Sequence, residues 1–190
     1  MRKMRSLFRR EERGATLVEF SLIFTLLLML ALGAFEYGMA LRDWISVTIA
    51  TREGARVAAS AANYLEADCT ILEATTGALR SFRVGNVRQV HIYKSDEDGA
   101  YNAGQSSRYR PYLGGSTGGL PLVACGASTW VRLANSWPPA QRVSPTDDTY
   151  WIGVRLVYDH PWQTGFLWWN GTVSWTDDAV FKIEPPPPNA

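Results

Sequence analysis

The chain has 190 residues, and its 19 Lys or Arg and 18 Asp or Glu give a formal net charge of +1. This length suits one domain with an appendage, and the balanced charge argues against a nucleic-acid-binding protein, which usually carries a basic domain or stripe. Apolar residues make up 46% of the chain, which is too much for a disordered protein.

The first third of the chain is organised as a basic segment followed by an apolar run. Residues 15–41 contain only three ionisable side chains, those of Glu19, Glu36 and Tyr37. A bilayer core of about 30 Å needs about 20 helical residues, so the run is long enough to span a membrane. Six of the 19 basic residues precede it: Arg2, Lys3, Arg5, Arg9, Arg10 and Arg13.

The flanking charges predict the orientation of this span. Basic residues beside an apolar run stay in the cytoplasm, so the remainder of the chain is expected outside the cytoplasmic membrane, with Trp44 as an interfacial anchor. A cleaved secretory signal is the alternative, but its apolar region normally has about 7–15 residues. The nearest cluster of small residues, 58–62, lies far downstream of the run.

Glu19 is the residue that indicates a function. A carboxylate inside hydrocarbon costs several kcal/mol unless it is paired, so it is a candidate functional group. Cleavage after Gly14 would create an ammonium group at Ala15, one helical turn from Glu19. In parallel helices, the Ala15 ammonium of one subunit would pair with Glu19 of the next only in one axial register.

The stretch from Arg13 to Phe20 resembles a type IV pilin-like signal: a basic leader, then Gly14, then an apolar helix with Glu19 at its fifth position and Phe20 after it. This resemblance implies cleavage between Gly14 and Ala15 by a membrane-embedded prepilin peptidase, and it leaves N-methylation of Ala15 open. The alternative is an uncleaved signal anchor in which Glu19 is incidental.

Further motifs make the chain similar to TadE-like proteins. The resemblance implies a minor pseudopilin of the tight-adherence (Flp) pilus machinery, which is a structural subunit, with no enzymatic activity and no cofactor, that assembles with other pilin-like subunits. Residues 96–150 match no part of the family pattern, which leaves open the alternative that this segment gives the head a specialised role. The matching segments are 14–22, 34–38, 51–59, 154–161 and 180–185.

The helical pattern continues beyond the membrane run to about Leu65, which predicts one helix about 75 Å long. We therefore divide the chain into a leader (1–14), a transmembrane and stalk helix (15–65) and an extracytoplasmic head (66–190). Glu36 lies near the outer membrane face. Solvent or a charged residue of a neighbouring subunit would satisfy it.

The head is predicted to have an α+β fold. A short helix is expected over 70–82, with Asp68 as its N-cap. Alternation of apolar residues predicts antiparallel strands that pack against the stalk helix. These strands are 87–93, 151–158 and 179–183, and residues 96–127 are expected to form a long surface excursion.

Cys69 and Cys125 are the two cysteines of the chain. Outside the membrane they are expected to form one disulfide, which would contribute about 4 kcal/mol in the chain-entropy model. Two free, buried thiols are the alternative. Neither pairs with a His in a spacing typical of a metal site.

Several weaker signals are assigned ordinary structural roles. Residues 114–118 match a nucleophile-elbow string, but Pro121 follows where a helix would have to begin. His91 and His160 are single and are expected to be core or surface residues. Residues 96–99 lack the later ligands of a calcium loop, which favours a solvated turn and leaves an irregular Ca²⁺ site open.

The eight tryptophans favour core and loop packing, with Trp168 and Trp169 the first pair to test for exposure. The rival interpretation of the whole chain is an unprocessed, single-pass, membrane-anchored binding or adhesion module. Its Tyr- and Trp-rich loops between residues 96 and 170 would then contact a surface, glycan or partner.

Overall fold

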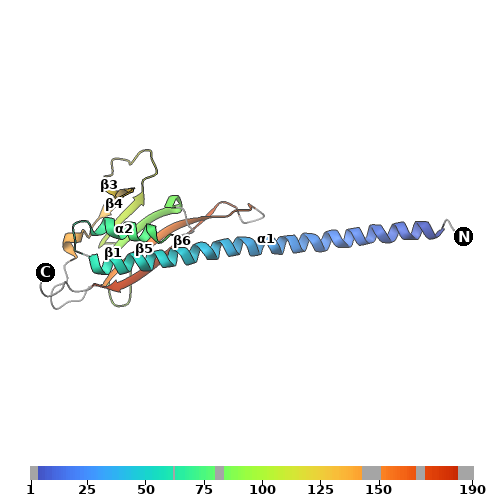
Figure 1. Ribbon diagram of the computed structural model, residues 1–190, viewed down its shortest axis with the longest axis horizontal. Helices are drawn as coiled ribbons and strands as arrows, with labels where there is room; N and C mark the ends of the chain where they lie inside the picture. The colour runs from blue at the N-terminus through green and yellow to red at the C-terminus, as the bar shows by residue number, and fades with distance from the viewer. Residues whose placement is uncertain (1–3, 62, 80–83, 143–150, 166–169, 184–190) are drawn as a thin grey trace.

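The computed structural model describes residues 4–61, 63–79, 84–142, 151–165 and 170–183. One long helix passes along a six-stranded antiparallel sheet and extends far beyond it, so the molecule has a handle and a head (Figure 1). A second, short helix lies on the sheet beside the long one. The predicted α+β fold is confirmed.

The long helix α1 (Met4–Ala61) has two halves with different surroundings. It contains no Pro, and every side chain from Gly14 to Ala31 is exposed. From Glu36 onward, buried residues recur every three or four positions, which is the spacing of one helix face. The helix begins before Ala15 and ends at Ala61, four residues short of the predicted Leu65.

The sheet has the strand order β3-β4-β2-β1-β5-β6, and all neighbours are antiparallel. The three predicted strands are present as β1, β5 and β6, although β6 begins earlier than position 179. The elements are α2 (Ala67–Gly77), β1 (Val87–Ser95), β2 (Ser106–Pro111), β3 (Leu122–Cys125), β4 (Ser128–Asn135), β5 (Trp151–Pro161) and β6 (Thr172–Lys182), with 3-10 turns η1 (Val84–Asn86) and η2 (Pro139–Gln141).

The prediction of a surface excursion over 96–127 is wrong for two segments, because β2 and β3 lie within it. β2 lacks the apolar alternation that marks a half-buried strand, because Ser106 and Ser107 occupy buried positions. Hydrogen bonds compensate the burial of these hydroxyl groups: Ser106 donates to Ala103 O, and Ser107 donates to Trp137 O, at 2.9 and 3.0 Å respectively. Strand β4 was not predicted.

Small residues of α1 allow it to pack closely against α2 and the sheet. A Cβ at Gly54 would overlap the Thr75 side chain of α2, so a larger residue would require Thr75 or the helix itself to move. Ala58, one turn later, is fully buried in the same core. Gly54 and Ala58 therefore serve packing within the chain.

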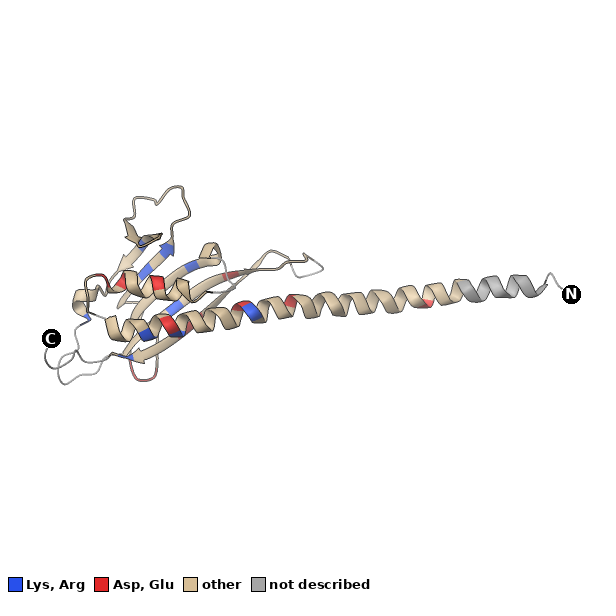
Figure 2. Ribbon diagram, in the orientation of Figure 1, with Lys and Arg blue, Asp and Glu red and all other residues tan. Residues whose placement is uncertain are grey.

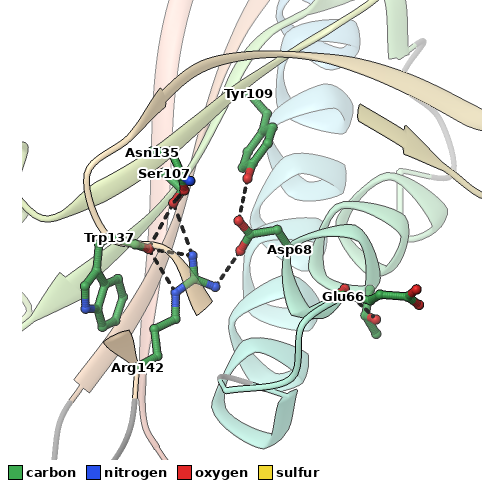
Figure 3. A network of polar contacts seen from close by, with 8 residues as sticks. Glu66, Asp68, Ser107, Tyr109, Asn135, Trp137 and Arg142 are labelled. Carbon is green, nitrogen blue, oxygen red and sulfur yellow. Dashed lines mark hydrogen bonds and ion pairs between the residues drawn. The ribbon is translucent and has the colours of Figure 1, made fainter. Parts of the chain in front are cut away.

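Asp68 does not cap α2, contrary to the prediction. The N-cap is Glu66, and Asp68 lies buried in the first turn, where it accepts a hydrogen bond from the Tyr109 hydroxyl and forms an ion pair with Arg142 (Figure 3). Burial and the neighbouring Asp68 carboxylate raise the pKa of Tyr109 far above its usual value, so its O–H stays protonated and continues to donate.

Arg142 is fully buried, and its guanidinium has further partners (Figure 3). It donates to Trp137 O at 2.9 Å and to Ser107 Oγ at 3.2 Å, and it lies over the Trp137 ring at 5.0 Å. The network therefore links α2 to β2 and to the segment after β4. The charge is both paired and hydrogen-bonded, as a buried charge must be.

The predicted disulfide between Cys69 and Cys125 is confirmed, with a Cα–Cα distance of 5.0 Å. Cys69 follows Asp68 directly, and Cys125 is the last residue of β3. Two consecutive residues of α2 thus fix the helix in place. Cys69 is joined covalently to β3, and Asp68 accepts a hydrogen bond from Tyr109 of β2 and pairs with Arg142 after η2.

We predict that Arg142→Met destabilises the head by about 3–5 kcal/mol, because it leaves the buried Asp68 carboxylate without its counter-ion. Denaturant unfolding of the full-length protein in detergent measures this loss. Arg56→Met is the control, since Arg56 is exposed and pairs with Glu53 on the same helix face. Equal midpoints for the two variants would contradict the structural role of the network.

Candidate functional site

The exposed half of α1 is the first candidate site. Within the described residues, one helix (Gly14–Ala61) is long and apolar enough to cross a membrane by length and composition alone. Its most apolar window has a mean hydropathy of 2.3, and none of that window is buried by the rest of the chain. α1 carries no charged residue between Glu19 and Glu36 (Figure 2). These side chains need an apolar environment that the described chain does not supply.

The predicted processing residues lie on this exposed half. Gly14 and Ala15 are in continuous helix, and a Cβ built at Gly14 would meet nothing within 4 Å. The fold therefore does not require glycine at position 14. Glu19 lies about 6 Å further along the axis from Ala15, and Phe20 beside it is 63% exposed. Among the described residues, none pairs with the Glu19 carboxylate.

The second half of α1 places polar groups on the face that contacts the β5–β6 hairpin. Glu36, Asp43 and Thr51 are buried and follow one another at intervals of about two turns, so they share one helix face. Each has a partner on the hairpin. We call these three contacts the polar ladder.

The first rung of the polar ladder is the Glu36 carboxylate, which accepts hydrogen bonds from the backbone N–H of Gln163, at 3.2 Å, and of Thr164. In the second rung, His160 Nδ1 lies 2.8 Å from Asp43 Oδ2. In the third, the Thr51 hydroxyl donates to Asp177. The ladder therefore fixes the hairpin along α1 and sets how far its loop reaches toward the membrane run.

Glu36 was predicted to meet solvent or a neighbouring subunit. The structure gives it two N–H donors from its own chain instead, which is a sufficient reason for a carboxylate to be buried at this position. The donors lie 127 and 128 residues away in sequence, so no local pattern pointed to them. A role of Glu36 between subunits stays a prediction.

Trp44 lies on the side of α1 that borders a groove. The groove has a volume of about 510 Å³ and lies between α1 and the β5–β6 hairpin. Sequence reasoning assigned its hairpin tryptophans only to general packing, because their convergence depends on the fold. The lining residues are Tyr37, Ala40, Leu41, Trp44, Trp162, Trp175 and Thr176.

His91 and His160 are buried histidines with hydrogen-bond partners, as predicted. His91 contacts the Tyr101 hydroxyl and Gln89 Oε1, both at 2.8 Å. Burial, and then the charges of Arg108 and Arg155, lower the pKa of His91 to about 4, so the ring is neutral at physiological pH.

The other discounted signals also have local structural explanations. Asp96 Oδ1 accepts the Ala100 N–H across the turn at residues 96–99. Residues 114–118 form a loop in which three glycines have positive φ angles, and no helix follows it in the described chain. No cluster of three or more His, Cys, Asp or Glu within the described residues is arranged to hold a metal ion. Trp168 and Trp169 lie outside the described residues.

We predict that Glu36→Gln accelerates amide hydrogen exchange at Gln163 and Thr164. Hydrogen bonds to a charged acceptor contribute about 1.5–3 kcal/mol, and the neutral amide retains only part of this. Exchange in the detergent-solubilised protein should therefore rise about tenfold at these two amides and remain unchanged in β1. Tyr37→Phe is the control on the adjacent exposed position. Unchanged exchange at both amides would show that the first rung does not hold the loop.

Comparison with known proteins supports the assignment of the N-terminal helix. The chain matches no curated protein and no solved structure. Residues 14–56 match the model of a family described as TadE-like protein, a segment of α1 that begins at Gly14 and ends at Arg56. The resemblance predicted from the N-terminal motifs is thereby confirmed over residues 14–56, the segment in which this chain is similar to the TadE-like family.

Proposed function

We propose that the protein is a pilin-like structural subunit that is cleaved after Gly14 and assembled through α1 into a tight-adherence pilus or its secretion apparatus. The TadE-like segment and the apolar N-terminal helix fit a pilin-like membrane subunit. The observation that carries the proposal is the position of Glu19, an acid without a partner among the described residues on an otherwise apolar exposed helix.

Electrostatics supplies the assembly mechanism. Cleavage after Gly14 would leave an Ala15 ammonium one turn from Glu19. Within one subunit both charges would lie at the same end of an apolar helix. In a bundle of parallel helices, the ammonium of one subunit would neutralise Glu19 of its neighbour. Because a buried, unpaired charge costs several kcal/mol, this pairing selects one axial register of the helices.

The proposed location follows from the same segment. Basic residues before the span are retained in the cytoplasm, so the helix inserts into the inner membrane with the head outside. The Cys69–Cys125 disulfide agrees with an extracytoplasmic head, because such bonds persist in oxidising compartments. The implied partners are a prepilin peptidase, other pilin-like subunits and membrane lipid.

We assign residues 1–14 to the leader, 15–65 to the membrane and stalk segment and 66–190 to the head. Ala34 and Gly38 are one turn apart and exposed on α1, and a Cβ at Gly38 would meet nothing within 4 Å. Small residues at this spacing allow helices to approach closely in a membrane. This face therefore suits contact with a neighbouring helix.

We predict that Gly14→Asp blocks processing and leaves the precursor at full length. The structure has open space at Gly14, so the effect would arise in the peptidase and not from misfolding. Gly38→Asp is the matched control, because Gly38 is also exposed on α1 with open space around it. An immunoblot of membrane fractions measures the mature size. A Gly14→Asp protein that begins at residue 15 would contradict this cleavage site.

We predict that Glu19→Gln is processed normally but enters sheared fibres at least about tenfold less than the wild type, because its Ala15 ammonium would have no charged partner. Ser21→Ala is the control, since the Ser21 hydroxyl bonds only to Val18 O of its own helix among the described residues. Immunoblots of fibre fractions, with N-terminal sequencing, report incorporation and processing together.

Normal incorporation of Glu19→Gln would contradict the pairing mechanism. An intact leader on the native protein, in membranes and fibres alike, would contradict the proposed function. That result would favour the unprocessed, membrane-anchored binding module.

A further inference from the structure

We propose that the groove between α1 and the β5–β6 hairpin binds a phospholipid of the outer leaflet of the membrane. The site rests on the proposed function in requiring that α1 spans the bilayer with the head outside the cytoplasm. Four features of the described residues support it: the level of the groove along α1, the chemistry of its lining, its continuity with the exposed side of α1 and the rigidity of its hairpin wall.

The level of the groove follows from the helix geometry. The segment from Ala15 to Phe35 has 21 residues and is about 32 Å long, which matches the hydrocarbon core of a bilayer. Tyr37 and Leu41 lie about 3 and 9 Å beyond Phe35, and the headgroup layer is about 5–8 Å thick on each side. The contact of Glu36 with the hairpin loop holds the hairpin at the same level. The groove therefore begins in the lipid interface.

The lining has the chemistry of a membrane interface. Tyr37 is 74% exposed and Trp44 is 49% exposed, and Trp162 and Trp175 face the same groove from the hairpin. Tyrosine and tryptophan concentrate at membrane interfaces because their rings are apolar and carry one polar group. Tyr37 lies at that depth, and Trp44, about 14 Å beyond Phe35, lies above it, so the groove leads out of the interface along α1. A volume of about 510 Å³ is within the range of small-molecule sites.

The groove is also continuous with the face of α1 that would contact lipid. Leu30, Tyr37, Leu41 and Trp44 are exposed and fall at helical spacing on one side. An acyl chain that lies along this side in the bilayer would reach the groove without crossing a polar barrier on α1. This continuity favours a lipid over a soluble ligand.

The hairpin wall is rigid before any ligand binds. Asp43 holds His160 through Nδ1, and the His160 ring stacks on Trp175 at 5.2 Å with an interplanar angle of 2°. The same ring meets Trp162 edge-on at 5.1 Å. One rung of the polar ladder thus fixes both tryptophans, so little conformational entropy is lost on binding.

The experiment uses the full-length protein in vesicles of phosphatidylethanolamine and phosphatidylglycerol whose chains are brominated near the headgroup or near the methyl end. Bromine quenches nearby tryptophan fluorescence. Carbonate extraction first reports whether the protein has inserted. We expect stronger quenching by the shallow label, and we expect Trp175→Phe to lose a large share of the quenched intensity. Trp130→Phe, a fully buried head residue, should lose none of it.

Extraction of the protein by carbonate would contradict the membrane span, and with it both proposals. Stable insertion with equal quenched intensities in Trp175→Phe and Trp130→Phe would overturn the lipid site alone. Quenching that disappears as the protein-to-lipid ratio rises would assign the groove to a second copy of the chain and would also overturn the lipid site.

Discussion

The second half of α1 is covered by its own head and the first half is not, and this division determines how the molecule can be used. Burial of one stripe from Glu36 onward completes the core, so the head is a finished α+β unit. The residues from Gly14 to Ala31 gain nothing from that core. Apolar side chains of this number must be covered by lipid or by other helices, and both environments are available to a pilin-like subunit.

The polar ladder links these two halves. Leu or Ala at positions 36 and 43 would pack a helix against a hairpin with less desolvation, but apolar contacts tolerate sliding. Carboxylates that accept hydrogen bonds from N–H donors or contact a histidine do not tolerate sliding. A shift of the hairpin by one turn along α1 would leave these buried charges unpaired. The ladder therefore sets the distance between the membrane segment and the head, which is the quantity a membrane-anchored subunit must control.

Sequence patterns predicted features that depend on neighbouring residues or on composition. The long helix, its TadE-like segment and strands β1, β5 and β6 follow from such local signals, and the disulfide follows from the cysteine count. Strands β3 and β4 were also missed, but two of the failures involve polar residues that are buried through distant partners. Ser107 in β2 and Asp68 in α2 are satisfied by Arg142, which lies 35 and 74 residues away respectively. A polar residue of this kind looks like a loop or cap residue until its partner is known.

Glu19 and Glu36 illustrate the same limit within one helix. Both are acids in the apolar run, and local sequence sets Glu19 apart by its place after Gly14 but does not show that Glu36 is satisfied within its own chain. The fold separates them, because the hairpin reaches Glu36 and supplies two donors, whereas the described chain supplies none at Glu19. Because its hydrogen-bond donors belong to its own chain, Glu36 can position the hairpin of the head. In an apolar environment, the Glu19 carboxylate requires a counter-charge from outside the described chain. The helix thus uses Glu36 for internal positioning and leaves Glu19 without a counter-charge among the described residues.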